Sequence, residues 1–141
     1  MAAFEALCRR EGLALTVQRR GIMEVLARRT DHPTADQIYE EVAPRLPGVS
    51  RTTVYRVLDT LVRIGAVRRA SHLGAAARFD PNTARHHHLV CLECDKVVDL
   101  DDVPVAVPPL PARRRAGFDV VDYAVDFRGT CPACRKRRAS G

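Results

Sequence analysis

The stretch that decides the fold is His86-His-His-Leu-Val-Cys-Leu-Glu-Cys94, and it is matched later in the chain by Cys131-Pro-Ala-Cys134. Four of the five cysteines therefore lie in two CxxC pairs. Two such pairs can supply the four thiolates of a closed, tetrahedral zinc site, which holds two distant segments together and has no open position for catalysis. A redox-active disulfide is the alternative for a single pair. Two pairs in so short a chain favour structural Zn(II) at Cys91, Cys94, Cys131 and Cys134.

Composition and charge narrow the class of protein. The chain has 141 residues, of which 46% are hydrophobic and 28% charged, as expected for one or two small domains. The N-terminus lacks the apolar core of a secretory signal, and the longest apolar run, 103–112, is broken by prolines. We therefore expect a cytoplasmic protein with no membrane partner, in which cysteines are ligands rather than disulfides. The net charge of +6, carried mostly by arginine, makes nucleic acid the leading partner.

The first half of the chain has helical periodicity. We predict helices over 4–11, after the N-cap Thr16, from Ala35 to about Leu46, and from Arg51 to about Ile64. After Gly65 the apolar period changes to two, and the segments 67–70 and 77–79 flank a turn around Gly74. This change of period predicts a β-hairpin.

Helices followed by a basic hairpin are the outline of a winged helix, in which the fourth helix lies in the major groove of DNA. The first turns of this helix carry side chains that can contact bases or phosphates, namely Arg51, Thr52, Thr53, Tyr55 and Arg56. A solvated basic helix in a helical bundle is the alternative interpretation.

The second half reads as short strands. We predict strands at 89–90, 97–98 and 118–127, the last leading into Cys131. The prolines between 104 and 111 argue against a regular helix before Arg113. We expect the tail 135–141 to be frayed, its charge aiding solubility or DNA affinity rather than forming a specific site. The expected fold class is α+β.

Histidines before the first CxxC pair suggest a second metal site. His86 and His88 share one face of a strand, and His87 points the other way. Together with the loop residue His32 and with Asp80 and Asp99, they would form a nitrogen and oxygen shell suited to Fe(II), Mn(II), Co(II) or Ni(II). Two exposed histidines are the simpler interpretation of the HxH pattern, and periodicity alone does not bring the five residues together.

Several motifs in combination resemble the ferric uptake regulator (Fur) family over nearly the whole chain. They are Leu15-Thr-Val-Gln-Arg19, His32-Pro-Thr-Ala-Asp-Gln-Ile-Tyr39, Ser50-Arg-Thr-Thr-Val-Tyr-Arg-Val-Leu58, Arg78-Phe-Asp80, the stretch 86–94 and the final CxxC. The resemblance implies a winged-helix DNA-binding domain (1–78), a hinge (79–83) and a small α/β dimerisation and zinc-binding domain (84–141). It also implies a homodimer that represses transcription on double-stranded operator DNA when its sensing metal is bound, with no organic substrate and no enzymatic activity. Arg19 joins the expected DNA contacts.

Within this family the chain is similar to the peroxide-sensing PerR branch, because the positions that match the regulatory shell, His32, Asp80, His86, His88 and Asp99, include two aspartates. The resemblance implies regulatory Fe(II) or Mn(II), and oxidation of His32 or His86 when the Fe(II) form meets hydrogen peroxide. The repressor then leaves DNA. The alternatives are an iron- or manganese-responsive repressor without peroxide sensing, and a zinc switch driven by cysteine oxidation.

Three departures from the family pattern limit the resemblance. Tyr123 stands where many relatives have a histidine of a further metal site, so we expect that site to be absent. Arg56 leaves the operator preference open between peroxide-type and iron-type sequences, and the proline-rich segment 104–111 replaces the start of a helix that packs in the dimer. Cys8 has no motif partner and is expected to be a buried bystander. A zinc deaminase fits poorly, because Val90 occupies the position of the glutamate in its H-x-E motif.

Overall fold

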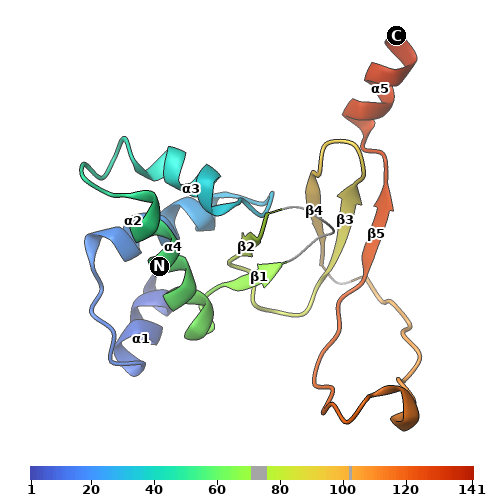
Figure 1. Ribbon diagram of the computed structural model, residues 1–141, viewed down its shortest axis with the longest axis horizontal. Coiled ribbons are helices and arrows are strands. Elements are labelled where there is room, and N and C mark those ends of the chain that lie inside the picture. The colour runs from blue at the N-terminus through green and yellow to red at the C-terminus, as the bar shows by residue number, and fades with distance from the viewer. Residues whose placement is uncertain (71–75, 102) are drawn as a thin grey trace. The chain divides into compact units, whose positions relative to one another are not determined.

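The computed structural model describes residues 1–70, 76–101 and 103–141. The chain divides into two compact units, Met1–Ala84 and Arg85–Gly141 (Figure 1). The turn predicted around Gly74 lies outside the described residues. The hinge predicted at 79–83 stays a prediction.

The first unit contains helices α1 (Ala2–Arg10), α2 (Val17–Arg28), α3 (Ala35–Val42) and α4 (Arg51–Arg63). Side chains of the predicted N-cap residues Thr16, Thr34 and Ser50 each accept a hydrogen bond from a backbone N–H in the first helical turn. Helix α3 ends at Val42, earlier than predicted. Pro44 explains the difference, because it lacks the N–H that would continue the helical hydrogen bonds.

A small hairpin completes the first unit. Strands β1 (Arg68–Ala70) and β2 (Arg78–Asp80) are antiparallel, with Arg69 opposite Phe79. Gly65 has a φ of +72° and turns the chain out of α4 toward β1. The apolar faces of the helices and the hairpin share one core, which includes Ile22, Leu26, Ile38, Leu58 and Phe79. The winged-helix prediction is confirmed.

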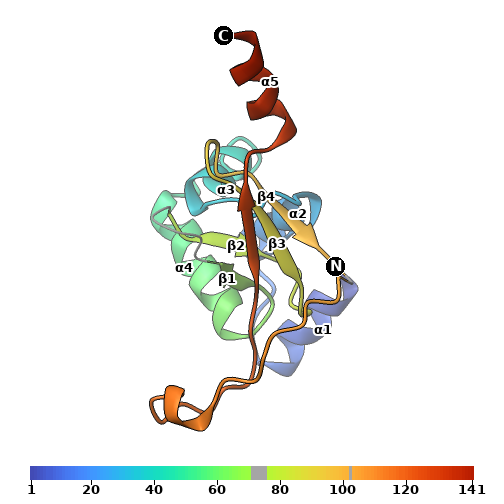
Figure 2. The same ribbon diagram turned by 90° about the vertical axis from the view of Figure 1, so that its right-hand side faces the viewer.

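The second unit is built on a three-stranded sheet in the order β4-β3-β5 (Figures 1 and 2). Strand β3 (His87–Cys91) is antiparallel to β4 (Val97–Leu100) and parallel to β5 (Asp126–Gly129). A parallel neighbour needs a long connection, and the segment between β4 and β5 provides it, with the 3₁₀ turn η1 (Ala112–Arg114) in its middle. Helix α5 (Pro132–Ser140) follows β5.

Two predictions for the second unit are wrong. The strand predicted over 118–127 is confined to Asp126–Gly129, since most of the residues before it are exposed and their alternation has no buried face to match. The tail predicted to be frayed is helical from Pro132 to Ser140. Proline is favoured in the first turn of a helix, and the positive charges of the arginines in the last turn interact favourably with the partial negative charge at the C-terminal end of the helix. In the described part of the chain, no helix is both long and apolar enough to cross a membrane.

Replacing Leu58, whose side chain is fully buried in the core of the first unit, by alanine should destabilise the helices of that unit. The expected loss is about 2–5 kcal/mol of unfolding free energy, because a cavity adds to the lost burial. Urea denaturation followed by helical circular dichroism measures it. The control is Val17→Ala, where the side chain is 68% exposed and the change should be small. Equal stability of both variants would contradict the assigned core.

Candidate metal centres and nucleic-acid interface

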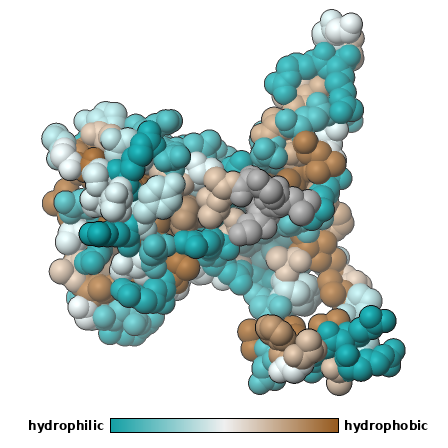
Figure 3. All heavy atoms as spheres, viewed as in Figure 1, coloured by the Kyte–Doolittle hydropathy of each residue, from teal (hydrophilic) through white to brown (hydrophobic). Residues whose placement is uncertain are grey.

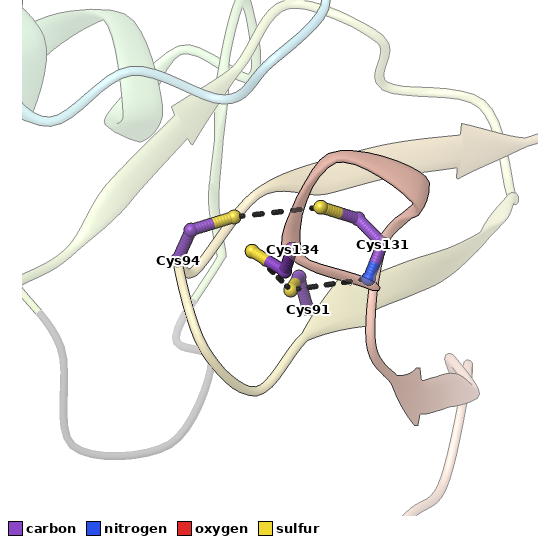
Figure 4. Close-up of side chains that lie close together, drawn as sticks. All are labelled: Cys91, Cys94, Cys131 and Cys134. Carbon is purple, nitrogen blue, oxygen red and sulfur yellow. Dashed lines mark hydrogen bonds between the residues drawn. The ribbon is translucent and has the colours of Figure 1, made fainter. Parts of the chain in front are cut away.

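The four cysteines of the CxxC pairs converge in the second unit (Figure 4). The Sγ atoms of Cys91 and Cys134 are 3.8 Å apart, and so are those of Cys94 and Cys131. Zn–S bonds of about 2.3 Å in a tetrahedron place sulfur atoms roughly 3.8 Å from one another. The spacing of the sulfur atoms therefore fits a Zn(II) ion between them.

Local structure explains how the two pairs meet. Cys91 ends β3, and Cys94 lies in the turn toward β4. Cys131 is the N-cap residue of α5, and Cys134 lies in the first turn of that helix. The backbone N–H of Cys131 donates to Cys91 Sγ at 3.3 Å, so backbone as well as sulfur joins the two segments.

The electrostatic surroundings of the buried sulfurs differ. Backbone N–H groups, first that of Cys131, lower the pKa of Cys91 to about 6. Burial raises the pKa of Cys134 to about 12. A divalent cation overcomes the effect of burial on Cys134, since a thiol that coordinates a metal is deprotonated outright. The four sulfur donors, of which those of Cys91 and Cys134 are buried, are thus suited to a divalent cation.

The loop that carries His32 is fixed within the first unit. Arg78 donates to the carbonyl of His32 at 3.0 Å, and the N–H of Phe79 donates to the carbonyl of Pro33 at 3.0 Å. His32 itself has a φ of +51°, a left-handed conformation that is uncommon for a residue with a side chain. Such backbone strain persists where surrounding contacts enforce it, and it is frequent at binding sites.

Asp80 lies beside His32. Its Oδ2 is 3.8 Å from Nδ1 of His32, and both side chains are buried. Its Oδ1 accepts a hydrogen bond from the N–H of Asn82 at 2.7 Å, which fixes the orientation of the carboxylate. The first unit therefore presents one imidazole and one carboxylate of the predicted regulatory shell as a neighbouring pair.

The second unit presents the other three predicted ligands as a cluster. Nε2 of His86 lies 3.0 Å from Nε2 of His88, and Oδ1 of Asp99 lies 3.5 Å from the former and 3.9 Å from the latter. Metal–imidazole bonds of about 2.0–2.1 Å place adjacent ligand atoms roughly 3 Å apart. Both histidines are buried, so the interpretation as two exposed histidines is wrong.

A residue that sequence reasoning missed supports this cluster. Asp126, the first residue of β5, lies opposite His88 in the parallel register, and its Oδ1 is 3.1 Å from Nδ1 of His88. A carboxylate at one ring nitrogen fixes the tautomer and leaves the other nitrogen able to bind a metal. No spacing in the sequence pairs residues 88 and 126; only knowledge of the strand order reveals it.

His87 faces away from the cluster, as predicted for the intervening residue of a strand. Its ring stacks on that of Tyr123 at a centroid distance of 6.1 Å, and its Nδ1 accepts a hydrogen bond from the N–H of Val125 at 3.2 Å. The guanidinium of Arg85 lies over the ring of Tyr123, 4.9 Å from its centroid.

Cys8, the cysteine outside the two CxxC pairs, is buried in the core of the first unit.

The predicted DNA contacts differ in their surroundings. Thr52, Tyr55 and Arg56 on α4 are exposed, and Thr53 is half-buried. Arg51, also on α4, is an exposed residue whose guanidinium donates to Asp36 at 2.6 Å and lies over the ring of Tyr39. Arg19 is half-buried, and its guanidinium donates to the carbonyl of Ala14.

A family model matches most of the chain. The ferric uptake regulator family model covers residues 10–128. The chain belongs to the ferric uptake regulator family. A curated relative, the peroxide-responsive repressor PerR of Staphylococcus epidermidis, is 34% identical over 131 residues, covering 93% of this chain and 87% of that protein.

Solved structures of similar proteins agree with the family assignment. A zinc-bound manganese uptake regulator has a TM-score of 0.67 at 25% identity, covering 90% of this chain and 97% of its own. PerR from Streptococcus pyogenes, solved to explain peroxide sensing and gene regulation, has a TM-score of 0.55 at 26% identity, covering 94% of this chain and 90% of its own. The chain thus shares the fold of this family.

Replacing Cys134 by serine should abolish zinc binding, because a tetrahedral site with three sulfur ligands loses its closed shell. Elemental analysis of the purified Fur-family protein should show zinc in the parent and little or none in the variant. The matched control is Cys8→Ala, which removes a buried cysteine of the first unit and should leave the zinc content unchanged. Full zinc content in Cys134→Ser would contradict the assignment of the ligands.

Replacing Asp126 by alanine should weaken Mn(II) binding by about 10- to 100-fold, because His88 loses the carboxylate that orients its ring. Asp126→Asn keeps a hydrogen-bond acceptor without the charge, so its Mn(II) affinity should lie between those of Asp126→Ala and the parent. Mn(II) titration followed by electron paramagnetic resonance measures the affinity in zinc-loaded protein. The control is Asp122→Asn, because the carboxylate of Asp122 pairs with Arg85 and not with a histidine of the cluster. An unchanged affinity in Asp126→Ala would remove Asp126 from the site.

Proposed function

We propose that this chain is a metal-dependent transcriptional repressor that binds operator DNA as a homodimer and senses peroxide by iron-catalysed oxidation of a ligand histidine. The observation that carries the proposal is the cluster of the buried His86 and His88 with the half-buried Asp99, in which Asp126 holds His88. This donor set of imidazole and carboxylate occurs in a chain that is 34% identical to a peroxide-responsive repressor. It suits Fe(II) and Mn(II), whereas the separate cysteine cluster suits Zn(II).

The regulatory shell takes ligands from both units in this proposal. His86, His88 and Asp99 belong to the second unit, while His32 and Asp80 belong to the first. The support for the first-unit pair is its own geometry: a buried imidazole in a left-handed backbone conformation, next to a carboxylate whose orientation is fixed. Two carboxylates and three imidazoles then complete a shell for one divalent ion.

The chemistry of sensing assigns a role to each side chain. When bound, Fe(II) supplies the redox chemistry with hydrogen peroxide, and Mn(II) supports the same shell without it. The imidazole of His32 or His86 gains one oxygen atom from the peroxide, whose other oxygen leaves as water. An oxidised imidazole is a poor ligand, so the shell is lost and the repressor leaves its operator. His88, Asp80 and Asp99 hold the remaining coordination positions.

Metal binding controls DNA binding through the link between the units. A metal that takes ligands from both units fixes their relative orientation, and with it the spacing of the two α4 helices of a dimer on successive half-sites. To move a population from about 1% to about 99% in the DNA-binding arrangement, the metal must bind that arrangement roughly 5.5 kcal/mol more tightly. In this proposal His32 and Asp80 bind the metal only in that arrangement, and their two bonds to the metal supply this difference in affinity.

The exposed side chains of α4 are the proposed reading surface. Arg56 and Tyr55 lie in the solvent-facing part of the helix, and Thr52 precedes them in its first turn. Arginine can donate two hydrogen bonds to guanine, and threonine or tyrosine can contact a thymine methyl group or a phosphate. Arg51 and Arg19 keep contacts within the first unit, so their proposed role on DNA is contact with phosphates at the rim of the interface.

The second unit supplies a surface for a second copy of the chain. Val98, Leu89 and Phe127 lie side by side across β4, β3 and β5, and their side chains are 40%, 45% and 43% exposed. They border a hollow of about 200 Å³. Apolar residues are also visible on the surface of the long loop between β4 and β5 (Figure 3). Contiguous apolar surface of this kind marks an interface, and in a family of homodimers we assign it to the partner subunit.

Peptide mass mapping after peroxide tests the sensing mechanism. Trypsin cleavage at Arg29 and Arg45 releases the peptide with His32, and cleavage at Arg85 and Lys96 releases one peptide that holds His86 to Cys94. After a brief low dose of peroxide, the Fe(II)-loaded, zinc-containing protein should carry one added oxygen on His32 or His86. The Mn(II)-loaded protein should carry none, and its complex with a selected operator fragment should persist.

The second peptide contains its own controls. Fragment ions should place the oxygen on His86 and not on His87, the neighbour that faces Tyr123. Oxidised Cys91 or Cys94 with intact histidines would replace the proposal by a zinc switch based on cysteine oxidation. No oxidation, with operator binding that still depends on metal, would leave an iron- or manganese-responsive repressor without peroxide sensing.

A further inference from the structure

We propose that Arg137 of α5 is a positioning residue for the zinc centre, where its guanidinium holds the Cys134 thiolate in place and slows both zinc loss and oxidation of the thiolates. The inference rests on the zinc site proposed above and goes beyond it, since it assigns a role to a residue that is not a ligand. It also replaces the expectation that the basic tail forms no specific site.

The geometry is that of a direct contact on one helix. Nη2 of Arg137 donates to Sγ of Cys134 at 2.8 Å. The two residues are three positions apart on α5, so their side chains lie on the same side of the helix. Cys134 is fully buried, whereas Arg137 is an exposed residue. The guanidinium therefore lies between a buried sulfur and solvent.

Charge gives this contact its effect. Four thiolates around one Zn(II) leave a net charge of −2, which buried surroundings stabilise poorly. Cys91 receives a backbone N–H, and Cys134 receives a charged donor. Hydrogen bonds with an ionised donor are stronger than neutral ones, and a guanidinium keeps its charge at any pH at which the protein is folded.

A second arginine keeps α5 in position. Nη2 of Arg138 lies 3.0 Å from Oε1 of Glu93, which belongs to the turn between Cys91 and Cys94. This ion pair joins the helix to the other CxxC segment without contacting sulfur. The two neighbouring arginines therefore have separable roles: Arg138 anchors the helix, and Arg137 acts on the ligand.

The chemical consequence is protection of the thiolate. A zinc-bound thiolate leaves the metal when it is protonated, and it is oxidised when peroxide reaches its lone pairs. A guanidinium that occupies one side of the sulfur opposes both events. With the zinc thiolates protected, a low dose of peroxide is consumed at the regulatory histidines first, and the structural site outlasts the signal.

The test uses the full-length, zinc-loaded protein with the substitutions Arg137→Gln, Arg137→Lys, Arg138→Gln and Arg135→Gln. Zinc release to a chromophoric chelator is followed at neutral pH, with and without peroxide. We expect Arg137→Gln to release zinc about 10- to 100-fold faster, as for the loss of other groups that support metal ligands. Arg137→Lys should rescue part of the effect. Arg135→Gln, an exposed position on the same helix, should match the parent.

Two further readouts separate ligand positioning from helix anchoring. In Co(II)-substituted protein, Arg137→Gln should shift the thiolate-to-cobalt absorption band, and Arg138→Gln should leave it in place. Zinc release from Arg137→Gln at the parent's rate would overturn the inference, as would release from Arg138→Gln as fast as from Arg137→Gln. A parent protein that contains no zinc, or Cys134→Ser protein that keeps it, would instead overturn the proposed zinc site itself.

Discussion

The pleat of β3 is the constraint on which the sites of the second unit depend. Alternate residues of a strand face opposite sides, so one short segment directs His86 and His88 to one side and His87 to the other. The same strand ends at Cys91, which places a sulfur at the end of the sheet beside α5. A shift of register by one residue would exchange these faces, turning ligands outward and His87 inward. Pairing on both sides, with β4 and β5, prevents that shift.

The strand also keeps the two metal chemistries apart. Hard and borderline donors cluster around His86 and Asp99, and soft sulfur donors cluster at Cys91 and its three partners. Each cluster takes further ligands from a different element: β4 contributes Asp99, while the start of α5 contributes Cys131 and Cys134. A site of imidazole and carboxylate can exchange and react, whereas a closed site of four thiolates holds the structure. In the proposed function, one chain can therefore lose its sensing metal without losing its fold.

Much of this arrangement was predictable from the sequence, and the failures have physical reasons. N-caps at Thr16, Thr34 and Ser50 gave helix starts correctly, because a capping side chain acts locally. The cysteine pairs and the HxH pattern were likewise recognisable, because the spacing of their residues can be read directly from the sequence. Asp126 was missed because its partner His88 is reached only through parallel strand pairing. The helix at Pro132–Ser140 was missed because its apolar content is low, and because the ion pair of its Arg138 with Glu93 is a tertiary contact.

The parallel pairing of β3 with β5 has a consequence for the order in which the protein forms. The first unit is complete in sequence before β3 begins, and it has a core of its own, so it can fold while synthesis continues. The second unit cannot. Its sheet needs β5, and the sulfur shell needs Cys131 and Cys134, which follow every strand in the chain. The unit proposed to bind DNA is therefore made first, and the unit proposed to hold the zinc and most of the regulatory ligands is completed only after the last cysteine has been synthesised.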